Sequence, residues 1–129
     1  MKNLDIKSVT GIAALLVHAA KIDEHYSEYE KNLVKDFVKS YLKEVNIDEI
    51  LKNAEELEKD SNQLLNFTNI IKNNSMETKR NILEHLWKIL ISDNTIDQYE
   101  SNLMRRICGL IYFPDKECAE IKMKLINSK

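Results

Sequence analysis

One acidic stretch of the chain occurs twice, and the two copies lie 70 positions apart without a gap. The copies span residues 23–34 and 93–104, and each follows an apolar run, 11–20 in the first case and 82–91 in the second. Five pairs of positions are identical: Asp23 with Asp93, Tyr29 with Tyr99, Glu30 with Glu100, Asn32 with Asn102, and Leu33 with Leu103. The repeat predicts two copies of one unit, a helix followed by an acidic turn and a second helix.

The composition favours a chain made only of helices. With 1 Pro and 2 Gly, the sequence has very few of the residues that the many turns of an all-β fold require. A length of 129 residues is enough for one domain with its own apolar core. We therefore expect residues 1–129 to form a single all-α domain.

Apolar positions with a helical period predict about seven helices in a compact bundle. The helices are expected to begin near residues 5–8, 27, 47, 60, 75, 97 and 114. The hairpins 12–40 and 82–110 should follow the same path and be related by a pseudo-twofold axis. The third and fourth helices should connect these hairpins, and the last helix should close one side.

The core is expected to centre on the two apolar runs, because 11–20 and 82–91 are apolar around most of their circumference. Leu16 and Leu86 occupy equivalent positions in the repeat and should both be buried. Gly11 costs roughly 1 kcal/mol against Ala in a helix, unless it permits close packing. The second helix is predicted to have one inward face, with Val34, Val38 and Tyr41 beside it. Four residues make up this face: Tyr29, Leu33, Phe37 and Leu42.

Helix caps explain part of the acidic pattern. Ser27 with Glu30, and Asp97 with Glu100, have the spacing of a capping box, in which the first side chain and the last one each bind the other's backbone N–H group. Asn46 and Ser75 are the expected caps of two further helices. The acidic side chains on the helix that follows Asn46 are interpreted as a solvated face: Glu55, Glu56 and Glu58.

Charge and targeting signals exclude several functions. The formal net charge is −2, so no global attraction to nucleic acid or to an anionic membrane is expected. Residues 1–10 lack a signal-peptide pattern, and the apolar run 11–17 is too short to span a bilayer. Cys108 and Cys118 have neither metal-ligand spacing nor a small secreted context. We therefore expect a cytoplasmic protein with both thiols reduced and no transmembrane segment.

Oxygen atoms gather in each acidic turn and raise the possibility of a cation site. Asp93, Thr95 and Asp97 alternate in the second turn, and Glu100 follows. Oxygen ligands suit calcium or magnesium better than zinc. The turn is not an EF-hand, because that loop requires Gly at its sixth position and Glu at its twelfth. The residues alone leave two interpretations open, a cation site or turns that only cap helices.

The same stretches resemble a known family, the TerB-like tellurite-resistance proteins. The likeness covers most of the chain, from about residue 11 to about residue 121. The segments that carry it are 15–23 with Glu30, 66–71, 85–93, 97–100 and 103–107. The resemblance implies an all-helical fold with an internal duplication and a role in stress response and tellurite resistance. It also implies protein partners, including membrane-associated complexes, because a related domain precedes the J-domain of a membrane co-chaperone.

The acidic residues of that family are suspected of chelating a divalent cation. The resemblance places these ligands here on Asp23, Glu30, Asp93 and Glu100, and Asp97 is added to them as a fifth candidate. Where the family has Gly after each aspartate, this chain has Glu24 and Asn94. Asn tolerates a left-handed backbone better than Glu does, so the second turn is expected to bind a cation more strongly than the first.

Three functions therefore remain open at the level of sequence. The first is a binding or adaptor module of the stress response whose acidic turns hold a cation. The second is a metal-dependent hydrolase that uses the same carboxylates, and the third is an interaction scaffold with purely structural turns. The sequence contains no Gly-rich phosphate loop and no His-Glu-x-x-His motif, which favours a protein that is not an enzyme.

Overall fold

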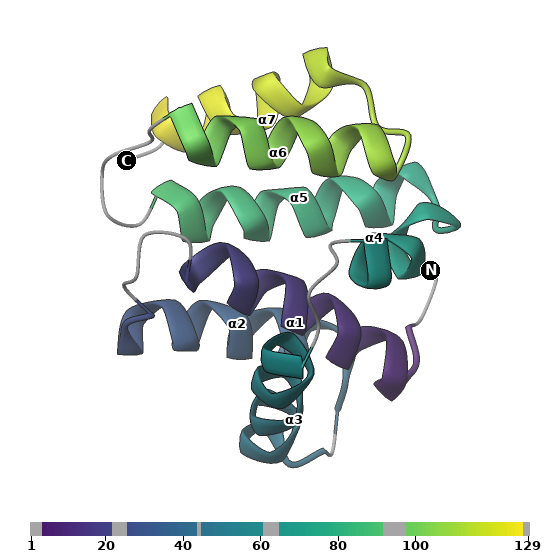
Figure 1. Ribbon diagram of the computed structural model, residues 1–129, viewed down its shortest axis with the longest axis vertical. Helices are drawn as coiled ribbons and strands as arrows, with labels where there is room; N and C mark the ends of the chain where they lie inside the picture. Colours follow the sequence, from purple (N-terminus) through teal and green to yellow (C-terminus); the bar gives the residue numbers. More distant parts are fainter. Residues whose placement is uncertain (1–3, 22–25, 44, 61–64, 92–97, 128–129) are drawn as a thin grey trace.

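The computed structural model describes residues 4–21, 26–43, 45–60, 65–91 and 98–127, and all regular secondary structure in these ranges is α-helical (Figure 1). The helices are α1 (Ile6–Lys21), α2 (Glu28–Tyr41), α3 (Ile47–Asp60), α4 (Leu65–Lys72), α5 (Met76–Ile91), α6 (Gln98–Leu110) and α7 (Asp115–Asn127). The predicted all-α fold is thereby confirmed. The start of α4 was expected at residue 60 or 61, and residues 61–64 lie outside the described residues.

The duplication in the sequence is visible in the bounds of the helices. α1 and α5 both contain 16 residues, and both ends of α5 lie 70 positions after those of α1. The first residues of α2 and α6, Glu28 and Gln98, differ by the same 70 positions. Buried positions repeat as well, since Val34, Phe37 and Val38 correspond to Met104, Ile107 and Cys108. The two helices that were predicted to flank each acidic stretch are confirmed in both copies, while residues 22–25 and 92–97 between them lie outside the described residues.

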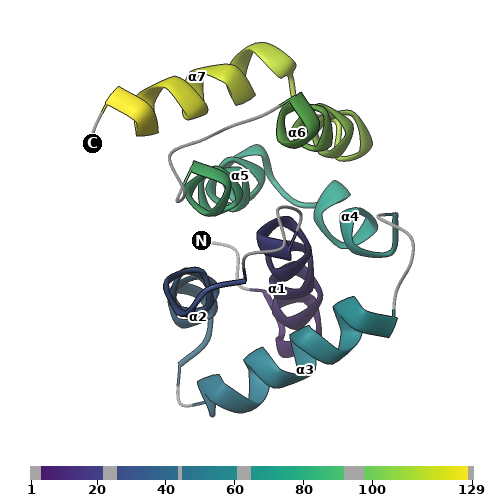
Figure 2. The ribbon, with the colours of Figure 1, turned by 60° about the vertical axis from the view of Figure 1, so that its left-hand side comes forward.

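α1 and α5 form the centre of the bundle. α1 lies against α2, α3, α4 and α5, while α5 also contacts α2 and α7 (Figure 2). α2 and α3 cover α1 on one side, and α6 and α7 lie on the opposite side of α5. The expectation that the two apolar helices are central is therefore confirmed.

The two hairpins differ in how closely their backbones pack. α2 approaches α1 closely, whereas the closest helical neighbours of α6 are α4 and α7. The surroundings also differ, because α3 packs along α1 and α7 packs along α5. The duplication therefore extends to helix bounds and buried positions but not to identical packing, and the pseudo-twofold axis stays a prediction.

Local capping explains where several helices begin. The Asp5 carboxylate accepts the Ser8 backbone N–H at 2.7 Å, and the Asn46 side-chain oxygen accepts that of Glu49 at 3.2 Å. Ser75 Oγ accepts the Thr78 backbone N–H, also at 3.2 Å. Such bonds satisfy backbone donors that have no partner within the helix. The caps predicted at Asn46 and Ser75 are confirmed.

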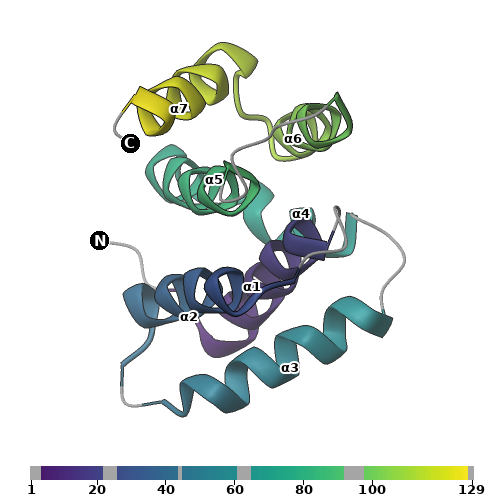
Figure 3. The same ribbon diagram turned by 90° about the vertical axis from the view of Figure 1, so that its left-hand side faces the viewer.

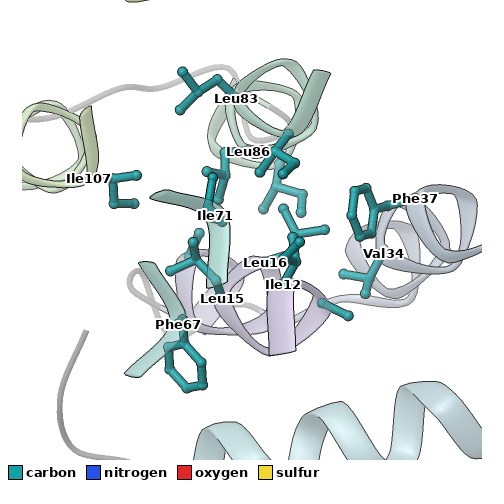
Figure 4. Packing of buried hydrophobic residues seen from close by; sticks show 14 of the residues in the cluster. Ile12, Leu15, Leu16, Val34, Phe37, Phe67, Ile71, Leu83, Leu86 and Ile107 are labelled. Carbon is teal, nitrogen blue, oxygen red and sulfur yellow. The ribbon is translucent and has the colours of Figure 1, made fainter. Parts of the chain in front are cut away.

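The core is continuous across α1, α2, α4, α5 and α6 (Figure 4). Leu16 and Leu86 face each other's helices there, and both side chains are fully buried. Gly11 allows α4 to approach α1, because a Cβ atom built at Gly11 would lie 2.3 Å from Ile70 Cδ1. The close packing that was expected to justify a glycine within this helix is therefore present.

Tyr29 faces solvent, although the periodic pattern placed it inward. The residue is 60% exposed. The buried side of α2 runs through Glu30, Val34 and Phe37, and Tyr29 lies one position, about 100°, away from it. Sequence periodicity indicates an apolar stripe, but the neighbouring helices decide which edge of that stripe is covered.

Within the described residues, no helix combines the length and the apolar character that crossing a membrane requires.

Candidate functional site

The structure describes one of the five predicted ligands in full. Asp23, Asp93 and Asp97 lie outside the described residues. Glu100 belongs to the first turn of α6, but its side chain also lies outside the described residues. Glu30 lies in the first turn of α2, and its side chain is described.

The helix ends that flank both acidic turns lie on one side of the molecule. α1 and α5 end there, and α2 and α6 begin there, at the left of Figure 1. The same side faces the viewer in Figure 3. This arrangement follows from the repeat, because each copy of helix, turn and helix reverses the chain at the same position. We call this side the acidic end.

Glu30 forms the capping box predicted from the sequence. The Ser27 backbone N–H donates to Glu30 Oε1 at 2.8 Å, and the Glu30 backbone N–H donates to Ser27 Oγ at 3.2 Å. The residue is only 4% exposed, so a carboxylate is held in the protein at the beginning of α2. A buried charge is costly unless polar groups compensate it, and the helix N-terminus supplies part of that compensation.

Tyr26 follows the first acidic turn in the sequence and links this part of the chain to α3. Its hydroxyl donates a hydrogen bond of 2.6 Å to Glu55 Oε2. Burial raises the pKa of the Tyr26 hydroxyl above its ordinary value, and the hydrogen bond to Glu55 raises it further. The hydroxyl therefore keeps its proton at neutral pH and remains a donor to the carboxylate.

Glu58 attaches the end of α1 to α3. Its side chain is 12% exposed and accepts a hydrogen bond of 3.0 Å from Lys21 Nζ. His18 Nδ1 lies 3.3 Å from the other carboxylate oxygen. The prediction that Glu55 and Glu58 form a solvated face is therefore wrong, because α3 crosses the end of α1 and both carboxylates gain partners there. Helical periodicity cannot reveal how α3 packs against α1, so no pattern in the sequence could predict these contacts.

A pocket of about 390 Å³ lies beside Tyr26. Its lining combines Tyr26 with four lysines and two glutamates: Lys21, Lys31, Lys52, Lys59, Glu55 and Glu56. The Lys31 ammonium lies 5.2 Å from the centroid of the Tyr26 ring, within the range of a cation–π contact. The lining carries four ammonium groups and two carboxylates, so it has an excess of positive charge and does not fit a cation site.

The described part of the site provides the kind of donor atom that a hard cation binds. Glu30 supplies a largely buried carboxylate, and oxygen is the donor atom that calcium and magnesium prefer. Within the ranges that the structure describes, no three His, Cys, Asp or Glu residues gather closely enough to hold a metal ion. The other four predicted ligands are not among the side chains to which that statement applies.

Fold and site together define the class of protein, an all-helical domain with a duplicated hairpin and two acidic turns. Residues 10–123 match the family model described as "Tellurite resistance protein TerB". The chain belongs to this family, because the match covers nearly its whole length. No curated protein and no solved structure matches the chain significantly.

Proposed function

We propose that this TerB-family domain is a binding module of the stress response that holds a divalent cation, calcium or magnesium, at its acidic end. The observation that carries the proposal is the repeated acidic turn, flanked in both copies by helices whose ends lie on one side of the molecule. The buried carboxylate of Glu30 supports it, because it provides an oxygen ligand beside the first turn.

Weak affinity is expected at both turns. Glu30 Oε1 already accepts the Ser27 N–H, so a cation would compete with the cap for this carboxylate. The second turn has three carboxylates in the repeat unit, Asp93, Asp97 and Glu100, while the first turn has Ser27 in the position of Asp97. We expect dissociation constants in the range of about 10⁻⁴–10⁻³ M, with the tighter site at the second turn.

A titration with calcium, magnesium and manganese, followed by backbone amide NMR, tests the cation. Amide shifts should concentrate in residues 93–100 at millimolar metal and should disappear in Asp93→Asn. Glu120→Gln, an exposed change on α7, is the matched control and should leave the shifts in place. Small shifts spread over the whole chain, or none, would leave the acidic turns as helix caps.

A protein partner is expected at the same end. Tyr29 lies in the first turn of α2, is 60% exposed, and is a residue type that often dominates protein interfaces. Its repeat counterpart is Tyr99. These features support a module that contacts a partner through its acidic end, as an adaptor does.

Photo-crosslinking in cells tests this contact. A photoreactive phenylalanine analogue at Tyr29 should form one discrete heavier band under stress, whereas the same analogue at the exposed Glu120 should not. The Tyr29 band should weaken in the Asp93→Asn background if the cation orders the interface. Equal crosslinking from both positions would show that the acidic end is not the binding surface.

A further inference from the structure

The two cysteines of the chain lie close together between α6 and α7, and neither spacing nor periodicity predicted this pairing. Both side chains are buried and line the same pocket, and each thiol shifts the pKa of the other. The proposed cation site does not include either residue.

The turn between the two helices produces this meeting. The Phe113 backbone N–H donates to the Cys108 carbonyl at 2.9 Å, and Tyr112 adopts a left-handed backbone conformation with φ of 60°. This is the pattern of a Schellman cap, which ends a helix and reverses the chain. The Cys118 backbone N–H then donates to the Pro114 carbonyl at 3.1 Å as α7 begins. The reversal therefore brings the last turns of α6 against the first turns of α7.

Polar groups around the sulfur of Cys118 favour its thiolate. The Trp87 indole N–H donates to Cys118 Sγ at 3.3 Å. The Lys122 ammonium lies 5.4 Å from the centroid of the Trp87 ring and one helical turn after Cys118. The hydrogen bond from Cys108 lowers the pKa of the Cys118 thiol and, with the Trp87 donor, outweighs burial and the nearby Asp115, which raise it. The same bond raises the pKa of Cys108, and burial adds to the increase.

A pocket of about 290 Å³ gives access to this pair. Both cysteines line it together with Trp87 and Met104, and its rim includes the exposed residues Arg105 and Ala119. Cys118 retains 5% exposure whereas Cys108 has none. A small molecule that enters from solvent would therefore reach Cys118 first.

We propose that Cys108 and Cys118 form a redox-reactive dithiol that small peroxides oxidise to an internal disulfide, with Cys118 as the attacking thiol. The Cys118 thiolate attacks one peroxide oxygen, the O–O bond breaks, and hydroxide leaves, so that Cys118 becomes a sulfenic acid. The Cys108 sulfur then displaces the sulfenic hydroxyl, and its proton leaves with that hydroxyl as water. Overall, two thiols lose two electrons and two protons, and one hydrogen peroxide is reduced to two waters, whereas an alkyl hydroperoxide would give one alcohol and one water.

Thiol titration and intact mass of the folded full-length chain test the proposal. Hydrogen peroxide should abolish both titratable thiols, remove the mass of two hydrogen atoms, and form no covalent crosslink between chains. A non-reducing peptide map should join the peptides that contain Cys108 and Cys118, and dithiothreitol should restore both thiols. Three results would each overturn the proposal. They are thiols that survive peroxide, crosslinks that form only between molecules, and an internal crosslink that forms only after unfolding in urea.

The Cys108→Ser variant tests the order of the two steps. Serine keeps a hydroxyl donor beside Cys118 but cannot close the disulfide, so peroxide should stop at the sulfenic acid, which dimedone would trap on Cys118. Cys118→Ser should leave Cys108 unmodified at the same peroxide concentration. A dimedone adduct on Cys108 in that variant, formed as quickly as the one on Cys118, would contradict the assignment of Cys118 as the attacking thiol.

Discussion

Leu86→Ala should lower the free energy of unfolding by roughly 2–5 kcal/mol. Leu86 lies on α5 at the centre of the bundle, and its side chain is fully buried. The substitution removes apolar surface from the core and leaves a cavity, because α1 and α5 are held by further helices and cannot collapse into the space. Urea unfolding followed by far-ultraviolet circular dichroism measures the change.

Leu65→Ala is the matched control for this prediction. Leu65 is also a leucine in a helix, but its side chain is 46% exposed. Its loss should change the unfolding free energy by no more than about 0.5 kcal/mol. An effect of Leu86→Ala as small as that of Leu65→Ala would show that α1 and α5 are not the centre of the core.

Helix existence and helix starts could be predicted from the sequence because the signals are local. The Ser27 and Glu30 pair, Asn46 and Ser75 each act on backbone groups within the same turn, and all three caps are present. The repeat added a second signal, since an offset of 70 relates both bounds of α1 to those of α5 and the start of α2 to that of α6. Such signals need no knowledge of how the helices pack.

Contacts between helices could not be predicted in the same way. The Tyr26–Glu55 hydrogen bond and the Lys21–Glu58 ion pair depend on the crossing of α3 over the end of α1. The Cys108–Cys118 contact depends on a reversal of the chain at Tyr112, which has a left-handed backbone conformation. Gly or Asn would have indicated such a conformation in the sequence, but this position has neither. Long-range packing alone determines these pairings, so periodicity and spacing could not predict them.

For the candidate site, the sequence predicted the role of Glu30 in the cap, and the structure confirms it. It did not predict that Tyr26, which follows the first acidic turn in the sequence, is hydrogen-bonded to Glu55 on α3. Local pattern thus identified the capping carboxylate, whereas the contact of Tyr26 depends on tertiary packing. The metal ligation of Asp23, Asp93, Asp97 and Glu100 stays a prediction, which the NMR titration addresses.

The second large effect is expected at Phe37, which α2 inserts between α1 and α5. Phe37→Ala should cost about 3–5 kcal/mol of stability, because the ring is fully buried. Its centroid lies 5.1 Å from that of Tyr41 and 5.2 Å from that of His85, in an edge-on contact with the latter. Tyr29→Ala on the same helix is the control and should change stability by no more than about 0.5 kcal/mol, since Tyr29 is exposed.

Phe37→Ala should also change how stability depends on pH, through His85. Burial lowers the pKa of His85 below its ordinary value of 6.5, although the Asn81 carbonyl, 2.9 Å from its Nδ1, opposes this shift. The unfolded chain therefore binds a proton before the folded one does, and the contribution of His85 to stability is complete above 6.5 and declines as the pH falls below it. Removal of the Phe37 ring admits water, so the His85 pKa should rise toward 6.5.

The destabilisation by Phe37→Ala should consequently be smaller at about pH 5.5 than at about pH 7.5, because the variant loses less stability than the original protein over this interval. Urea unfolding at both pH values measures the difference, and NMR titration of the His85 ring measures its pKa in each protein. The Tyr29→Ala control should show no such pH dependence. If Phe37→Ala destabilises the protein but leaves the pKa of His85 unchanged, the Phe37 ring does not shield the imidazole from water.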